Sequence, residues 1–153
     1  MIKINVFSEE RAWSKRLKKK EIFFKKICNS FPKKYKFHKK NISISLMLSN
    51  NKNIKRLNKN FRNKNKSTDI LSFPFDKKKK KNNQNYLKDI KKSHNYMFKL
   101  ISKNLRVFKQ KVAKTFIHGF LHLLGYDHVN DNDYKKMIKQ EEKLFKAVIS
   151  KIN

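Results

Sequence analysis

Histidine side chains are concentrated in one short segment near the end of the chain. His118, His122 and His128 are three of the five histidines in the 153-residue sequence, and its two glycines, Gly119 and Gly125, lie among them. Residues four apart share one face of a helix, so a helix here directs the imidazoles of His118 and His122 to a common point. Gly125 is typical of a left-handed helix end, and a chain reversal there brings His128 to the same point.

Three neutral imidazoles around one point favour a metal site. They leave a fourth tetrahedral position for water, which is the arrangement of catalytic zinc rather than of closed structural zinc. Burying three histidines in an apolar helix without a shared ligand would leave several polar nitrogens unsatisfied. We therefore predict one zinc ion per chain held by His118, His122 and His128, with nickel, copper and iron left open by ligand type. No small-molecule organic cofactor is expected.

The residue after the first histidine restricts the chemistry. The spacing matches the H-E-x-x-H-x-x-G-x-x-H motif of metzincin proteases, but Gly119 stands where those enzymes have the glutamate that acts as general base. Glycine cannot accept a proton, so peptide hydrolysis by that route is disfavoured. A bound metal still acidifies its water and polarises a phosphoryl oxygen. Phosphodiester cleavage would also need a cation near the site to stabilise negative charge on phosphorus.

The elements that must position the histidines follow from the apolar periodicity of the chain. Alternation predicts strands over 2–6, 42–48 and 70–73, the last ending at Pro74 or lying at a sheet edge, and a short edge strand over 86–90. Helical spacing predicts helices over 13–27, 54–61, 93–103, 108–124 and 131–149. Asn130 or Asp131 is a suitable cap for the last helix.

The predicted elements define a fold class. Strands and helices interleave without strict alternation, so we expect a single α+β domain with a small mixed sheet of about four strands packed with about five helices. The zinc site is expected at the C-terminal end of a central helix. The last helix should turn these apolar residues inward: Tyr134, Met137, Ile138, Leu144, Phe145 and Val148.

The charge balance has two explanations that the sequence leaves open. The chain has 41 Lys+Arg against 11 Asp+Glu, a net charge of +30, which attracts polyanions such as RNA. Lysine, asparagine, isoleucine and phenylalanine are abundant while glycine and proline number 2 each, a pattern that mutational drift in an A/T-rich genome would also produce. An apolar share of only 38% with this charge is typical of disordered chains, but 12% aromatic residues and the periodic segments indicate a folded one.

Three further features concern the environment of the protein. The lysine run 77–81 and the polar residues after it predict a solvated Lys/Asn-rich loop at 76–86. A single cysteine, Cys28, leaves no internal disulfide framework. The start of the chain lacks the apolar region of a signal peptide, and no apolar stretch has the length of a membrane span, so we expect a cytoplasmic protein with no membrane partner.

Two blocks of the sequence resemble a known family. The segment HGFLHLLGYDH at 118–128 looks like the HGxLHLxGxDH zinc motif of the bacterial YbeY-type rRNA maturation factors, which are metal-dependent endoribonucleases. The segments LNKNFR at 57–62 and STDILSFP at 67–74 are similar to the family's other characteristic stretch. The two blocks stand in the right order, and the histidine block is the more specific.

The resemblance implies an activity and partners. It implies a single endoribonuclease domain over 1–153, with an α+β fold around a central mixed sheet and zinc bound by the three histidines. The implied substrate is single-stranded RNA, and the implied role is 3′-end maturation of the small-subunit (16S) rRNA and ribosome quality control. Partners would be ribosomal RNA and the small ribosomal subunit.

Two further residues acquire roles on this basis. Arg62 matches the family's important arginine, and its always-charged guanidinium can grip a phosphate in bidentate fashion, so it is the catalytic candidate. Asp127, next to a ligand, is a candidate to orient an imidazole from behind. The chain departs from the family at four positions. Asn63 and Lys88 stand where glycine is more usual, Asn65 where an acidic residue is, and Ser67 where proline is.

Two alternatives to a zinc-dependent endoribonuclease remain. The first is a ribosome- or rRNA-binding assembly factor whose metal is structural and whose catalysis is weak, and the glycine at position 119 favours it because no base is visible. The second, and weaker, is a metalloprotease of altered type.

Overall fold

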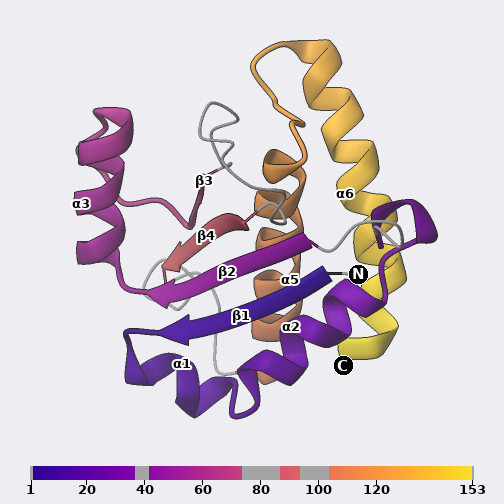
Figure 1. Cartoon of the computed structure of the whole chain (residues 1–153), viewed down its shortest axis with the longest axis horizontal. Helices are drawn as coiled ribbons and strands as arrows, with labels where there is room; N and C mark the ends of the chain where they lie inside the picture. The colour runs from indigo at the N-terminus through magenta and orange to yellow at the C-terminus, as the bar shows by residue number, and fades with distance from the viewer. Residues whose placement is uncertain (1, 37–41, 74–86, 94–103, 153) are drawn as a thin grey trace, which may run out of the picture.

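The computed structural model describes residues 2–36, 42–73, 87–93 and 104–152, with β4 described by its backbone only. In chain order the strands and helices are β1 (Ile2–Ser8), α1 (Arg11–Arg16), α2 (Lys20–Asn29), the 3-10 turn η1 (Lys33–Tyr35), β2 (Ile42–Ser49), α3 (Asn51–Arg62), β3 (Ile70–Phe73), β4 (Leu87–Ser93), α5 (Leu105–Leu123) and α6 (Asp131–Ile152). They form the predicted α+β fold (Figure 1).

The sheet has four strands in the order β1-β2-β4-β3. Strands β1, β2 and β4 run parallel, with Ile2 opposite Ile42 and Ser43 opposite Leu87, while β3 pairs antiparallel to β4 with Phe73 opposite Asp89. The predicted small mixed sheet is therefore confirmed. The predicted edge strand over 86–90 is wrong in its position, because β4 has a hydrogen-bonded neighbour on each side and β3 forms the edge.

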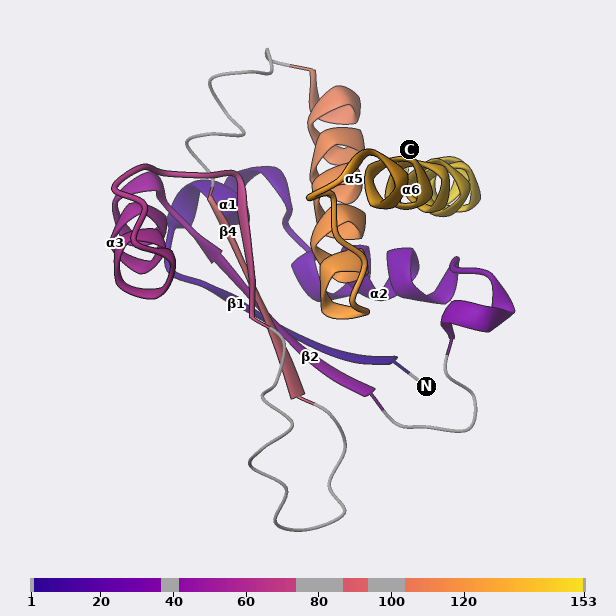
Figure 2. The same cartoon turned by 90° about the horizontal axis from the view of Figure 1, so that it is seen from above.

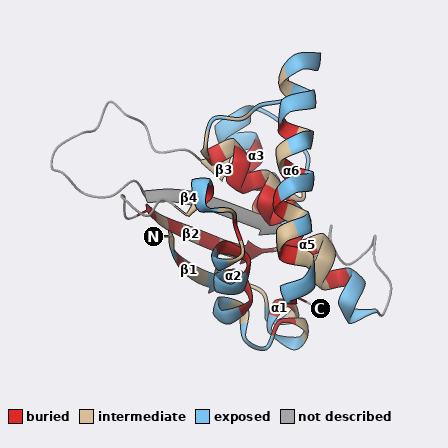
Figure 3. Cartoon of the chain, turned by 90° about the vertical axis from the view of Figure 1, so that its right-hand side faces the viewer, coloured by how far each residue is buried: buried red, intermediate tan, exposed pale blue. Residues whose placement is uncertain are grey.

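Helices cover both faces of this sheet. Figure 2 shows α3 on one face and α2, α5 and α6 on the other. The core lies on the second face, where alternate residues of β2 are buried: Ile42, Ile44, Leu46 and Leu48. Aromatic rings from three segments fill the space above them, with Phe24 5.2 Å from Phe116 and Phe31 4.9 Å from Phe120 between ring centroids. Figure 3 shows the buried residues running along β2 and α5.

The predicted helix over 13–27 is wrong as one element, because the chain leaves the helical conformation at Leu17 (φ −119°, ψ 74°) and restarts at Lys20. The break allows two segments to bury apolar groups in different directions. In α1 the indole of Trp13 donates a hydrogen bond to the Ser49 carbonyl (3.0 Å), and α2 buries Phe23 and Phe24. A loose apolar pattern among lysines does not show such a change of direction.

The other predicted helices are confirmed where the structure describes them. Helices α3, α5 and α6 contain the apolar residues that predicted them, and Asn130 caps α6 by accepting a hydrogen bond from the Asp133 backbone (2.9 Å). Tyr134 is a correction, since its side chain is 53% exposed. It lies in the first turn of α6, which extends beyond the end of α5 (Figure 1). The helix predicted over 93–103 (beyond Ser93), Pro74 and the Lys/Asn-rich loop lie outside the described residues.

Among the described residues, no helix is both long and apolar enough to cross a membrane.

Candidate metal centre

The end of α5 reverses the chain through a hydrogen-bonded cap. The Gly125 backbone donates to the His122 carbonyl (3.0 Å), and the Tyr126 backbone donates to the Leu121 carbonyl (3.1 Å), which is the Schellman pattern. Gly125 has φ +91°, a conformation that side-chain-bearing residues rarely adopt. The turn that the sequence predicts at Gly125 is therefore present, and it carries the following residues back along the helix end.

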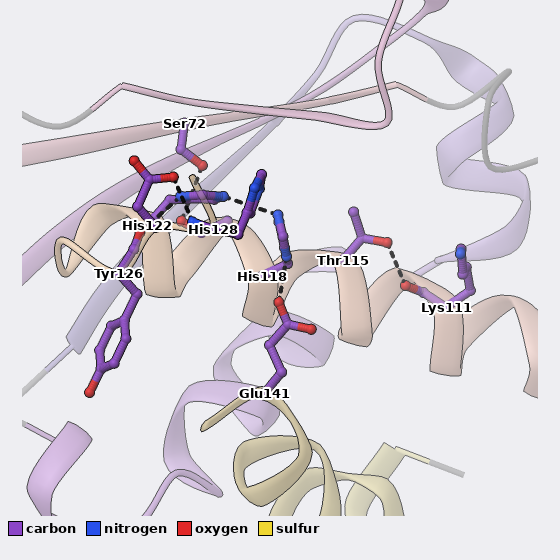
Figure 4. Close-up of polar contacts among 10 residues, drawn as sticks. Ser72, Lys111, Thr115, His118, His122, Tyr126, His128 and Glu141 are labelled. Atoms are coloured by element: carbon purple, nitrogen blue, oxygen red, sulfur yellow. Dashed lines mark hydrogen bonds and ion pairs between the residues drawn. The ribbon is translucent and has the colours of Figure 1, made fainter. Parts of the chain in front are cut away.

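This reversal gathers the three predicted ligands. The ring centroids of His118, His122 and His128 lie 4.7 to 5.5 Å apart, and one potential ligand atom of each lies within 4.8 Å of the others. His118 and His122 are half-buried on successive turns of α5, and His128 is exposed on the loop before α6. Figure 4 shows the rings facing one another above the helix. The cluster could hold a metal ion.

Two of the rings are fixed through their outer nitrogens. His118 Nδ1 is paired with the carboxylate of Glu141 on α6 (Figure 4), and His122 Nδ1 donates to the carbonyl of Tyr126 (3.0 Å). A neutral imidazole that donates from Nδ1 has an unprotonated Nε2. Both Nε2 atoms therefore present lone pairs to the centre of the cluster.

The remaining contact tests whether a metal fits. The Nε2 atoms of His118 and His122 face each other at 3.0 Å. When both rings are neutral with their protons on Nδ1, no hydrogen atom joins these nitrogens, and either a metal ion between them or a further proton on one Nε2 relieves the repulsion of their lone pairs. Two nitrogens bound to one tetrahedral zinc ion at about 2.0–2.1 Å are separated by about 3.3 Å. The donor set and its spacing therefore fit such an ion.

The surroundings favour neutral imidazole at His122. Burial lowers the pKa of this side chain, and the neighbouring rings of His118 and His128 lower it further. The hydrogen bond to Tyr126 and the charge of Asp127 oppose this shift without reversing it. Neutral imidazole is the form that binds metal.

Gly119 lies in close contact with β3. A Cβ at this position would overlap the end of the Ile70 side chain and lie 3.0 Å from Ser72 Oγ, so a larger residue here would require Ile70 to move. Ser72 Oγ donates to the Gly119 carbonyl (3.1 Å) and fixes this approach. The backbone between two of the predicted ligands is thereby held against the sheet.

The other predicted site residues lie at different distances from the cluster. Arg62 is the exposed last residue of α3, on the opposite face of the sheet from α5 (Figure 2), and within the described residues no hydrogen bond or ion pair joins it to the histidines. Asp127 is exposed and accepts a hydrogen bond from the His128 backbone (2.8 Å).

Sequence reasoning missed the partners of the two fixed rings. Glu141 belongs to the buried stripe of α6, where a glutamate among Met137, Leu144 and Val148 was the available signal. The hydroxyl groups of Tyr126 and Tyr35 lie 3.4 Å apart, and the Tyr35 hydroxyl donates a hydrogen bond to the Gln140 side chain (2.5 Å). Burial raises the pKa of Tyr35, and the neighbouring Tyr126 raises it further. No local pattern indicates this contact between segments far apart in sequence.

Fold and site together define an α+β protein with a three-histidine cluster, set at a helix end, that could hold a metal ion. The family model described as Endoribonuclease YbeY matches residues 5–149. A curated Endoribonuclease YbeY of Pelagibacter ubique (strain HTCC1062) is 55% identical over 152 residues, covering 99% of each chain. One of Buchnera aphidicola subsp. Acyrthosiphon pisum is 40% identical over 126 residues, covering 82% of this chain and 78% of the relative.

A solved structure agrees with these matches. The solution structure of a Thermotoga maritima protein is similar at a TM-score of 0.57 and 25% identity, covering 97% of this chain and 89% of that one. The chain belongs to the Endoribonuclease YbeY family. Its class of activity is that of an RNA-cleaving hydrolase.

Proposed function

We propose that the chain is a zinc-dependent, single-strand-specific endoribonuclease whose domain spans residues 1–153. It acts in the cytoplasm on the small ribosomal subunit, in 3′-end maturation of 16S rRNA and in ribosome quality control. The observation that carries the metal site is the 3.0 Å approach of two Nε2 atoms, with the third imidazole beside them. Family membership supports RNA as the substrate.

Each residue has a defined part in this proposal. His118, His122 and His128 hold the ion, Glu141 and the Tyr126 carbonyl hold two of the rings, and Asp127 orients the loop that carries the third. When bound, zinc supplies an acidified water and a Lewis acid that polarises a phosphoryl oxygen. Arg62 binds a phosphate of the RNA backbone from the end of α3.

Single-strand preference has support beside Arg62. Phe61 is 68% exposed and packs edge-on against Phe73 with ring centroids 5.4 Å apart. An exposed aromatic ring next to an arginine offers an unpaired base a surface for stacking. Paired bases are already stacked in a duplex and gain nothing from it.

Single-turnover cleavage of RNA tests the activity. We expect the native chain to cut single-stranded RNA containing the 3′ end of precursor 16S rRNA, and His122→Ala to lose both zinc and cleavage. His38→Ala is the matched control, because it removes a histidine outside the 118–128 segment. Equal background rates for the native chain and His122→Ala would instead favour the assembly factor with a structural metal.

Recognition of the ribosomal substrate needs a separate comparison. We expect faster cleavage of the precursor 3′ end than of an unrelated single-stranded RNA of equal length and composition. A duplex form of the same precursor sequence should remain intact. Equal rates on the two single strands would remove the ribosomal assignment and leave a general ribonuclease.

A further inference from the structure

A basic groove lies at the far end of α5 from the histidine cluster. Its walls come from the end of α1, the link between α1 and α2, α2 itself, and the ends of α5 and α6 that include Lys109 and Ile152. Figure 1 shows these segments gathered at the end of the molecule opposite to the turn between α5 and α6. About 17 helical residues separate Leu105 from His122, a distance of about 25 Å along the axis.

The groove is richer in positive charge than the basic chain as a whole. Seven of its 12 lining residues are lysine or arginine, against 41 of 153 in the sequence, and none is acidic. Six of the seven are lysines: Lys15, Lys18, Lys19, Lys26, Lys109 and Lys151. No salt bridge in the described part of the chain joins these lysines to a carboxylate.

The arrangement has a physical cost that a polyanion removes. Like charges held together without counter-charges repel one another, and an anionic chain replaces that repulsion with attraction while releasing its own counterions. None of the described acidic residues lines the groove: Glu10 and Glu21 lie at the starts of α1 and α2 but outside its lining, and Asp127, Asp131 and Asp133 lie around the turn into α6. The charge distribution therefore favours a polyanion at the groove.

Apolar and fixed groups in the groove suit a nucleic acid. Ile22 and Leu105 line it and are 49% and 45% exposed, so they offer bases an apolar contact beside the lysines. The guanidinium of Arg16 lies over the ring of Phe108, 5.0 Å from its centroid, which holds this cation in place before a ligand arrives. Single-stranded nucleic acids are bound by positively charged grooves of this kind, which follow the phosphate backbone.

We propose that this groove is a second RNA-binding site, which holds the backbone of the substrate RNA away from the point of cleavage. The inference rests on the proposed function for the identity of the polyanion. Only an RNA long enough to reach both places can bind the groove and the histidine cluster at the same time. At about 3.4 Å per stacked nucleotide, the 25 Å separation corresponds to roughly seven nucleotides.

Binding measurements with two matched triple variants test the groove. The first variant carries Lys18→Gln, Lys26→Gln and Lys151→Gln, all exposed lining lysines. The control carries Lys139→Gln, Lys143→Gln and Lys146→Gln, exposed lysines of α6 that do not line the groove. Both lose the same net charge, so a long-range effect of charge alone affects them equally.

The ligands are single-stranded RNAs of about 16 and about four nucleotides, and the latter is too short to span the two sites at about 3.4 Å per nucleotide. We expect the groove variant to bind the long RNA at least about tenfold more weakly, and the slope of log K against log salt to fall by about 2. The control should lose less than about threefold. Cleavage of the short RNA by the groove variant should stay at the native rate, which also shows that it folds.

Two results would overturn the proposal. Equal losses in the two triple variants would show that net charge alone attracts RNA. An equal loss on short and long RNA would place the effect at the centre of cleavage. Failure of the native chain to cut either RNA would count against the proposed function, whereas the groove would still be judged by the binding measurements.

Discussion

At the scale of single residues, Glu141 shows how the cluster is held. Its side chain is nearly buried on α6, and a buried carboxylate is costly unless it is paired. Its partner is His118 Nδ1, so the carboxylate fixes both the orientation and the tautomer of that ring. Carboxylates behind a metal-binding imidazole raise its basicity as a ligand. Glu141 is therefore a positioning residue for the proposed metal.

Replacing this carboxylate should weaken metal binding before it affects folding. We expect Glu141→Gln to lower zinc affinity by about 10- to 100-fold, because an amide retains the volume but not the charge. Competition with a chromophoric chelator measures this affinity directly. Glu142→Gln is the matched control, since the neighbouring glutamate is exposed and carries the same charge. Equal affinities for the two variants would show that Glu141 contributes packing only.

Gly119 is the second residue whose type is set by its contacts. We expect Gly119→Ala to destabilise the fold by about 1–3 kcal/mol, because its methyl group would overlap the side chain of Ile70. Urea unfolding followed by circular dichroism measures the loss. Ile70→Val removes the atom nearest to the added methyl, so the double variant should recover part of the stability relative to the two single changes. Simple additivity of the two losses would exclude the predicted overlap.

At the scale of elements, the last turn of α3 keeps its geometry without the glycine that the family more often has there. Asn63 adopts the left-handed conformation at φ 53°, which asparagine tolerates better than other residues with a side chain. Asn58 supports the following loop by donating from its side chain to the Lys66 carbonyl (2.8 Å). The end of α3, with Arg62, is therefore defined despite the departure.

This cap gives a prediction about substitutions at one position. We expect Asn63→Gly to change the free energy of unfolding by less than about 1 kcal/mol, and Asn63→Val to lower it by about 1–2 kcal/mol, since a β-branched residue is strained at positive φ. Urea titration of both variants gives the comparison. If valine were tolerated as well as glycine, the left-handed conformation at Asn63 would be incorrect.

The elements also show which parts of the fold were accessible from sequence. Strand β2 and helix α5 were predicted because their apolar periods are regular, and the turn at Gly125 was predicted because glycine is typical of a left-handed helix end. The internal position of β4 was missed, since its sequence is rich in lysine and its place depends on pairing with β2 and β3. The break between α1 and α2 was missed for a similar reason, because distant contacts decide it.

At the scale of the whole molecule, the candidate site joins segments that the sequence separates. The three histidines come from α5 and the following loop, Glu141 comes from α6, and Gly119 holds α5 against β3. The convergence of the histidines could be predicted because helix spacing and one turn produce it. The contact of Glu141 with His118 could not be predicted, because the position of α6 beside α5 depends on the packing of the entire core.

Such a site couples metal binding to the stability of the whole fold. The cluster exists only when α5, its cap and α6 are packed, so zinc should bind the folded chain in preference to the unfolded one. At free zinc of about 100–1,000 times Kd this adds about 3–4 kcal/mol, which raises the melting temperature by about 5–15 °C. Calorimetry of the chelator-treated chain, with and without added zinc, measures the shift.

Calorimetry also tests whether the rise in melting temperature comes from zinc bound at the three histidines. His128→Ala removes an exposed ring that packs little, so its metal-free form should melt near the metal-free native chain. Its response to zinc should be much smaller, because two imidazoles remain instead of three. Magnesium, which prefers oxygen ligands, should leave both chains unchanged. An equal zinc response in the native chain and His128→Ala would mean that the ion binds elsewhere, and the three-histidine centre would lose its support.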